Sequence, residues 1–545
     1  MTTIIETTDA AGSTSTLYAM LAGDVFIGKL SQGETDWIAV TLVAGHTYSF
    51  GSVGLGAAGS GVTDPLLKLR AANGTVLNNG SLADDAGPGF NADLQYTAVT
   101  SGTYYIEVKS LSGAIDGEYG LVVTEGNRPS YDAELGAAVI YREGITWAAT
   151  PGTAVALTWG VRASGPALDA SGNSAPFSQL SAAQIAATEA ALANFAEVGN
   201  ISFTQVDPGS ATILVGAYTS ASDGAGAYAY FPGSTAAGNS AGDLWINNDA
   251  VSTNSLPVGS YDHFVFLHEL GHAIGLDHPG DYNAAPGVTI TYNNAAQFIE
   301  DSQQFSVMSY FSASATEPDS PTTYSDTLML YDIYAIQEMY GVNNATRSGN
   351  DTYGFHATLG GAYDFTVNVD PLLCIWDGAG IDTLDLSGFG GRQIIDLNDG
   401  AFSNVGGFTG NLSIAVGADI ENAVGGRGRD KIYGNELNNV LKGGRGVDIL
   451  FGAGGNDRMT GNAGADGFLF LDGFGRDRIT DFSTTDDLLS LSSDLWGGGV
   501  MTASEVLASF AVIRNGSVVL DFVTDELTLK GVSATTGLAD NILIA

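Results

Sequence analysis

The sequence has one cysteine, Cys374, among 545 residues, which excludes an internal disulfide framework. Basic residues are also scarce, because 19 lysines and arginines face 60 aspartates and glutamates, for a formal net charge of −41. Nucleic acid binding needs clustered basic residues, so a nucleic acid partner is not expected. No apolar run approaches the roughly 18 residues of a membrane span, and the N-terminus lacks the basic and apolar regions of an ordinary signal peptide. The acidic excess fits a chain that binds hard cations or works in salty water.

The length exceeds what one hydrophobic core supports, so the sequence predicts a multidomain protein. Residues 15–126 alternate apolar and polar side chains in short runs between glycines, which predicts an antiparallel β-sandwich. Residues 135–345 mix strand and helix patterns, which is typical of an α+β domain. Residues 346–545 carry a glycine-rich repeat that predicts a parallel β-roll.

Within the α+β region, residues 145–150 and 155–161 have the pattern of strands. The alanine-rich stretch 180–198 predicts an amphipathic helix with Ser181 as its N-cap. Two more helices are expected at YDHFVFLHELGHAIG and at LMLYDIYAIQEMYG, the second ending at Gly341.

Five consecutive nine-residue blocks begin at Gly425: GGRGRDKIY, GNELNNVLK, GGRGVDILF, GAGGNDRMT and GNAGADGFL. The sixth position is an aspartate or asparagine in every block, and the eighth is apolar. A flexible linker would not keep two residue classes in phase over five blocks. The glycines allow tight turns that direct backbone carbonyls to a common point, and the apolar residue fits a short inward-facing strand. Looser copies flank the array at 376–386 and 472–482.

Stacked turns of this kind would form a roll whose loops share Ca²⁺, a hard cation that takes about six to eight oxygen ligands. We therefore expect several calcium ions. The expected ligands come from the blocks and their flanks: Asp377, Gly380, Asp382, Glu421, Gly426, Gly428, Asp430, Asn439, Gly444, Gly446, Asp448, Gly455, Asp457, Gly464 and Asp466. The second block has Leu437 in place of glycine and Asn439 in place of aspartate, so we expect its site to be weak.

Three of the six histidines, His268, His272 and His278, lie in the stretch HELGHAIGLDHPG. On a helix, the first two are one turn apart on the same face, so their imidazoles can occupy two corners of a zinc tetrahedron. Gly275 can adopt the left-handed conformation that ends the helix and returns the chain, which brings His278 round as a third ligand. A fourth position stays open for water, as catalytic zinc requires. Glu269 is offset enough to reach a water on the metal rather than the metal itself.

This set, HExxHxxGxxH, resembles the motif of the metzincin zinc proteases. Metzincins have a tight turn whose methionine packs beneath the metal without binding it, and SVMSYF supplies Met308 for that role. Tyr310 follows two places later. In serralysins, which are metzincins with C-terminal RTX repeats, the tyrosine at this position can be a fifth zinc ligand and stabilises the transition state.

Other segments agree with the serralysins, among them HPGDYNA, YDIYAIQEMYG and IWDGAGIDTLDLSGF, and the nonapeptides resemble the RTX repeat GGxGxDxUx with U apolar. The resemblance covers roughly residues 140–545 and implies a metzincin catalytic domain over 135–345, followed by an RTX β-roll with a C-terminal secretion signal. Residues 15–126 resemble instead the pre-peptidase C-terminal domain of secreted bacterial proteases.

The resemblance implies a zinc endopeptidase in which a water on the zinc attacks the peptide carbonyl, Glu269 is the general base, and Tyr310 helps to stabilise the oxyanion. Lysine and arginine are absent from Ala163 to Thr346, which leaves no basic group there to bind the free carboxylate of an exopeptidase substrate. This absence favours an endopeptidase. The segment GDLWIN fits two interpretations equally well: an edge strand that pairs with extended substrate, or an ordinary core strand.

RTX proteins typically leave the cell through a type I secretion channel, and calcium folds them outside. The resemblance therefore implies an extracellular monomer whose partners are the type I secretion machinery and protein or peptide substrates. An alternative from another functional class is a calcium-ordered surface or adhesive protein with a vestigial protease domain. The acidic charge, the sandwich and the roll would suit that alternative, but every catalytic position is intact.

Overall fold

The structure, a computed structural model, describes residues 2–31, 33–55, 65–77, 91–110, 117–141, 145–165, 167–234, 240–284 and 288–545. Contacts divide the chain into two compact units. The first unit comprises residues 1–316 and 327–343, and the second comprises residues 317–326 and 344–545. The segment 317–326 therefore packs with the repeat region, although the sequence assigned it to the α+β region.

Two sheets form the N-terminal part of the first unit, and most of their strands pair antiparallel. The first sheet has the order β1 (Thr3–Ile5), β3 (Val25–Leu30), β9 (Gly117–Glu125), β5 (Thr47–Leu55), β7 (Ala92–Thr97). The second has the order β2 (Ala19–Met20), β4 (Asp36–Leu42), β8 (Gly102–Ser110), β6 (Pro65–Arg70). Two pairs, β1 with β3 and β2 with β4, are parallel, and β1 precedes the boundary expected at residue 15.

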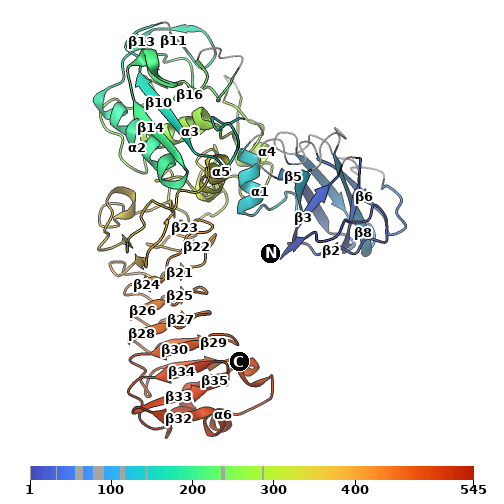
Figure 1. Cartoon of the computed structure of the whole chain (residues 1–545), viewed down its shortest axis with the longest axis vertical. Coiled ribbons are helices and arrows are strands. Elements are labelled where there is room, and N and C mark those ends of the chain that lie inside the picture. Colours follow the sequence, from blue (N-terminus) through green and yellow to red (C-terminus); the bar gives the residue numbers. More distant parts are fainter. Residues whose placement is uncertain are drawn as a thin grey trace. The chain divides into compact units, whose positions relative to one another are not determined.

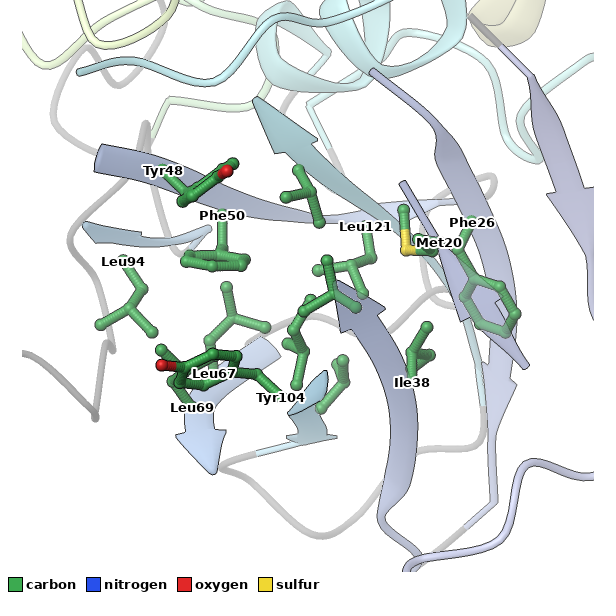
Figure 2. Packing of buried hydrophobic residues seen from close by; sticks show 14 of the residues in the cluster. Met20, Phe26, Ile38, Tyr48, Phe50, Leu67, Leu69, Leu94, Tyr104 and Leu121 are labelled. Atoms are coloured by element: carbon green, nitrogen blue, oxygen red, sulfur yellow. The ribbon is translucent and has the colours of Figure 1, made fainter. Parts of the chain in front are cut away.

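Side chains from both sheets build one hydrophobic core, in which Phe50 and Leu121 of the first sheet pack with Ile38, Leu67 and Tyr104 of the second (Figure 2). All five are at most 5% exposed, which is the burial expected for the inward-facing half of an alternating strand pattern.

The rest of the first unit contains a mixed sheet with the order β14 (Ile201–Gln205), β10 (Val155–Val161), β15 (Ile213–Tyr218), β17 (Leu244–Asn247), β16 (Ala227–Ala229). Strands β14, β10, β15 and β17 are parallel, and β16 is an antiparallel edge strand. A two-residue strand, β13 (Phe177–Ser178), also pairs with β15, and β11 (Ala167–Leu168) pairs with β12 (Ser174–Ala175).

The helices of this unit include α1 (Ala133–Ile140), α2 (Ala182–Val198), α3 (Tyr261–Ile274), α4 (Tyr292–Ala295) and α5 (Leu330–Tyr340). Helix α2 begins as predicted, with Ser181 as N-cap and a reciprocal hydrogen bond from Gln184. The strand predicted at 145–150 is wrong, because this segment is irregular. Its Trp147 indole donates to the Ala273 carbonyl (2.9 Å), so a tertiary contact at the end of α3 replaces strand pairing.

The second unit holds two long sheets that the chain visits alternately, as the orange and red strands of Figure 1 show. One has the order β18 (Thr352–Gly354), β20 (Thr383–Asp385), β24 (Asn422–Val424), β26 (Val440–Arg445), β28 (Arg458–Ala463), β30 (Arg476–Ile479), β34 (Glu526–Leu529), β33 (Ser517–Asp521), β32 (Ala511–Arg514). The other has the order β21 (Ile394–Asp396), β25 (Lys431–Tyr433), β27 (Ile449–Phe451), β29 (Gly467–Phe470), β31 (Leu488–Leu491), β35 (Ile542–Ile544).

Neighbouring strands of these sheets pair in parallel, except for β32–β33 and β33–β34. A third sheet contains β19 (Leu373–Ile375), β23 (Leu412–Ile414) and β22 (Phe402–Ser403), and helix α6 (Ala503–Phe510) follows the repeats. The apolar eighth positions of the five blocks are all buried, from Ile432 to Phe468. Among the described residues, no helix has the length and apolar character to cross a membrane.

Candidate metal and catalytic site

Helix α3 carries His268, Glu269 and His272, and its two ends are well defined. Ser260 caps the N-terminus by accepting a hydrogen bond from the His263 backbone N–H (3.2 Å). Gly275 ends the helix with a φ of 121°. A Cβ at this position would lie 2.1 Å from the Ile145 carbonyl oxygen, so glycine is required both for backbone conformation and for space.

The three histidines converge. The Nε2 atom of His278 lies 3.0 Å from Nε2 of His272 and 3.2 Å from Nε2 of His268. They form one of three groups among the described residues whose possible ligand atoms lie within 4.8 Å of one another, and all three histidines are buried. The turn after α3 therefore brings His278 to the two helical histidines.

Backbone carbonyls orient two of these rings. The Nδ1 atom of His268 lies 2.8 Å from the Val307 carbonyl oxygen, and Nδ1 of His272 lies 2.7 Å from the Leu276 carbonyl oxygen. Nδ1–H donates to these carbonyls, so the Nε2 lone pairs point at the shared centre. Burial, followed by the nearby His272, lowers the pKa of His268 to about 3, which keeps that ring neutral. Converging neutral imidazoles are the donor set that zinc prefers, so the residues present fit this ion.

Glu269 and Tyr310 lie beside the histidines. Glu269 is 8% exposed, and burial raises its pKa to about 8. The Tyr310 ring centroid is 4.5 Å from that of His278 and 5.7 Å from that of His268. Burial, and then the charge of Glu269, raises the pKa of Tyr310 to about 12, so its hydroxyl is a hydrogen-bond donor at neutral pH.

Met308 is fully buried under helix α3. A Cβ on Gly271 would lie 2.5 Å from the Met308 sulfur, so the glycine inside HELGH leaves room for this side chain. The methionine therefore packs against the backbone of the helix that carries two of the histidines.

Sequence reasoning missed Asp332, the fully buried aspartate in the first turn of α5. It accepts hydrogen bonds from Ser306 Oγ (2.6 Å), from the Val307 backbone N–H (2.8 Å) and from the Met329 backbone N–H (2.9 Å). Since the Val307 carbonyl orients His268, Asp332 holds the segment on which that ring depends. The available signal was an acidic residue in an otherwise apolar stretch, LMLYDIYAI.

A second buried aspartate, Asp301, was also missed. Its Oδ1 atom accepts from Tyr282 Oη (2.8 Å) and from Ser309 Oγ (2.7 Å). The Tyr282 ring stacks on His278, with centroids 5.5 Å apart, and Ser309 lies between Met308 and Tyr310 in sequence. One carboxylate oxygen thus joins the loop of the third histidine to the turn of Tyr310.

The GDLWIN segment is an internal strand, because β17 lies between β15 and β16. The interpretation as an edge strand is therefore wrong, and the edge next to helix α3 is β16.

A different arrangement appears in the repeat region, where side-chain oxygens accept backbone N–H groups from the preceding turn. Asp448 Oδ1 accepts from the Asp430 N–H (2.8 Å), and Asp466 Oδ1 accepts from the Asp448 N–H (2.9 Å). The same contact joins Asp430 to Gln393, Glu421 to Asp382, Asp457 to Asn439, Asp477 to Asp457 and Asp487 to Asp466. Asp477 and Asp487 continue this series beyond the residues that the sequence singled out.

Several of these carboxylates keep a buried oxygen with no hydrogen-bond partner. These atoms are Oδ2 of Asp382, Asp448, Asp457 and Asp477. Burial raises the pKa of Asp448 and Asp457 to about 7 and that of Asp477 to about 8. Buried carboxylate oxygens without donors fit a bound cation, and an oxygen-only donor set suits calcium.

The turn glycines serve two purposes. Gly380, Gly444, Gly446 and Gly455 have positive φ. Gly426, Gly428 and Gly464 do not, and here glycine is needed because the backbone of the preceding turn passes close by. A Cβ would lie 2.5 Å from Phe389 O, 2.1 Å from Gly391 O and 1.6 Å from Gly446 O, respectively.

The two other clusters of possible ligands among the described residues consist of carboxylates. Asp377 and Asp382 join Asp351, which sequence reasoning missed, and the Asp382 backbone N–H donates to Glu421 Oε2 (2.6 Å). The last cluster combines Glu6 and Asp9, which follow β1, with Asp36 at the start of β4.

Comparison with known proteins shows the family to which this chain belongs. A family model described as Matrixin matches residues 173–307, and one described as Peptidase M10 serralysin C terminal matches residues 342–505. Metallopeptidase AprA of Pseudomonas marginalis is 39% identical over 450 residues, which cover 78% of this chain and 93% of that protein. The chain belongs to the serralysin family.

It is therefore a zinc metalloendopeptidase, as predicted. Serralysin of Photorhabdus luminescens is 42% identical over 63% of this chain and 73% of that protein. Serralysin G of Dickeya chrysanthemi is 38% identical over 58% of this chain and 67% of that protein. The pre-peptidase C-terminal domain of a Bacillus anthracis collagenase matches 20% of this chain and 93% of its own at 17% identity, with a TM-score of 0.16, too low to establish the fold of the N-terminal sheets.

Proposed function

We propose that this serralysin-family member is an extracellular endopeptidase that cleaves proteins with Glu269 as general base and Tyr310 as oxyanion donor. The observation that carries the proposal is the convergence of three Nε2 atoms, two of them on rings oriented by backbone carbonyls, beside the buried Glu269 and the partly buried Tyr310. His268, His272 and His278 would hold the zinc. Membership of the family does not favour the alternative of an adhesive protein with a vestigial protease domain.

Zinc held by the three imidazoles would polarise the peptide carbonyl and make the attacking water more acidic. In its carboxylate form Glu269 would accept the proton of that water, a step that its raised pKa favours, and would then deliver this proton to the leaving amine. Tyr310 keeps its hydroxyl proton at neutral pH and donates a hydrogen bond to the developing oxyanion. Met308 and Gly275 have structural roles, in packing and in ending the helix.

Extended substrate would pair with β16, the edge strand beside helix α3, by strand addition. Because β16 is three residues long, only a short stretch of substrate would be held by backbone hydrogen bonds. This pairing suits an internal segment of a polypeptide and supports endopeptidase action.

Calcium would bind between the turns of the repeat region. The buried unpartnered oxygens of Asp382, Asp448, Asp457 and Asp477 support this role. The remaining expected ligands, including Asp377, Glu421, Asp430 and the turn glycines, lie in the same series of turns. Export by a type I system, with folding on meeting extracellular calcium, and a monomeric state complete the proposal.

The test compares the wild type with Glu269→Gln, each assayed for zinc content and for casein hydrolysis. We expect one zinc per chain in both proteins and a loss of kcat of at least about 1000-fold in the variant. A wild-type chain that holds one zinc but shows no activity dependent on Glu269 would support the adhesive alternative.

A further inference from the structure

The turn Gly434–Asn439 differs from the other turns of the repeat. Asn439 occupies the place of the repeat aspartate, and its amide is saturated by the protein. Its Oδ1 accepts from the Asn435 backbone N–H (2.9 Å), and its Nδ2 donates to the Glu421 carbonyl (2.9 Å) and to Asn435 Oδ1 (2.8 Å).

Asn435 completes the arrangement from the second position of the same block. Its Nδ2 donates to the carbonyls of Leu397 (3.0 Å) and Ile420 (3.1 Å), and its Oδ1 also accepts from the Leu437 backbone N–H (3.1 Å). A side-chain amide has two N–H donors, so both amides use every donor they have. Both side chains are buried, at 8% exposure for Asn435 and 1% for Asn439.

The neighbouring aspartate turns differ from this turn in the side-chain groups that they present. Asp448 and Asp457 each present a buried oxygen with no donor, which a cation would satisfy. The turn Gly434–Asn439 presents amide hydrogens instead, aimed at the carbonyls of the turn before it. Positive amide hydrogens and a cation compete for the same carbonyl oxygens, so the donor set here does not fit calcium.

We infer that Asn435 and Asn439 take the place of a calcium ion, joining the turn Gly434–Asn439 to the preceding turn by hydrogen bonds alone. This inference rests on the calcium role proposed above and removes Asn439 from the expected ligands. Stacked repeats extend from a formed neighbour more readily than they start anew. A turn that needs no ion is therefore a starting point on which the calcium-dependent turns after Gly443 assemble.

The first test counts calcium ions per full-length chain by native mass spectrometry at saturating calcium. Asn439→Ala is compared with the wild type, and Asp448→Asn is the matched control at the same block position. We expect Asn439→Ala to keep the wild-type count and Asp448→Asn to lose at least one ion. Loss of an ion in Asn439→Ala overturns the inference.

The second test needs no variant. Hydrogen exchange of the wild type is followed in EGTA and in calcium. Amides of residues 434–442 should stay protected in EGTA at least tenfold more strongly than those of residues 443–470. Equal loss of protection in both segments overturns the inference. A wild type that binds no calcium at all is a different result, which overturns the calcium proposal itself.

Discussion

The histidine site and the repeat turns both bring possible metal ligands together, but the two differ in how far protein groups satisfy and orient those ligands. At the histidine site, carbonyls of Val307 and Leu276 orient the rings, and Asp332 and Asp301 hold the segments around them. In the repeat, Asp448, Asp457 and Asp477 each have a buried oxygen that no protein group satisfies. The expected zinc ligands are positioned by protein hydrogen bonds, whereas the expected calcium ligands keep buried oxygens that no protein group satisfies. Zinc should therefore be needed for chemistry, whereas calcium should be needed for folding.

Selective chelation should separate these roles most strongly. We expect 1,10-phenanthroline to abolish casein hydrolysis while the repeat amides keep their exchange protection. We expect EGTA to remove that protection over residues 443–470, because buried carboxylates without a cation repel one another and lose hydration. Hydrogen exchange and activity measured on the same samples provide the check. If phenanthroline alone unfolded the repeat, or if EGTA left the repeat folded, the assignment of zinc to catalysis and of calcium to folding would be wrong.

Tyr310→Phe should have the next largest effect. Removal of one oxyanion donor lowers kcat by roughly 100-fold, with a much smaller change in KM. Tyr282→Phe is the matched control, since it removes a hydroxyl from a neighbouring ring that contacts Tyr310 at 5.1 Å between centroids but has its hydroxyl bonded to Asp301. Steady-state kinetics on one peptide substrate would compare the two. Equal losses of kcat would show that general packing, and not the Tyr310 hydroxyl, is responsible.

Local patterns explain which parts of this molecule could be predicted. The cap of α2 at Ser181 and the phase of the repeat depend on residues close in sequence, and the sequence shows them directly. Asp332 and Asp301 matter because of where other segments fold, and no spacing rule points to them. Likewise, β17 could not be recognised as internal until the three-residue strand β16 was seen to cover it.

Asp332→Ala should weaken the first unit. The Val307 N–H, the Met329 N–H and the Ser306 hydroxyl would lose their buried acceptor, at a cost of about 3 kcal/mol in the free energy of unfolding. Zinc affinity should fall as well, since the Val307 carbonyl orients His268. Glu338→Ala, an exposed position on the same helix, is the control and should change neither quantity. Urea unfolding and competition with a zinc chelator would measure the two effects. An unchanged zinc affinity in Asp332→Ala would limit its role to stability.

The smallest expected effect is a pH dependence confined to the calcium-free repeat. Burial raises the pKa of Asp448 and Asp457 to about 7 and of Asp477 to about 8, above the value of about 3.9 for an unfolded chain. The folded state therefore binds protons more tightly, and this stabilisation is present below pH 4 and is lost as the pH rises through 7 to 8.

In EGTA, the melting temperature of the repeat should fall between pH 5 and pH 8, and Asp477→Asn should reduce the slope. Calcium should reverse the trend, because it displaces these protons and binds more tightly as the carboxyl groups ionise. Calorimetry at a series of pH values, with and without calcium, would follow both slopes. If the repeat in EGTA became more stable towards pH 8, the unpartnered oxygens would not need a cation. The proposed difference between the repeat turns and the histidine site would then be wrong.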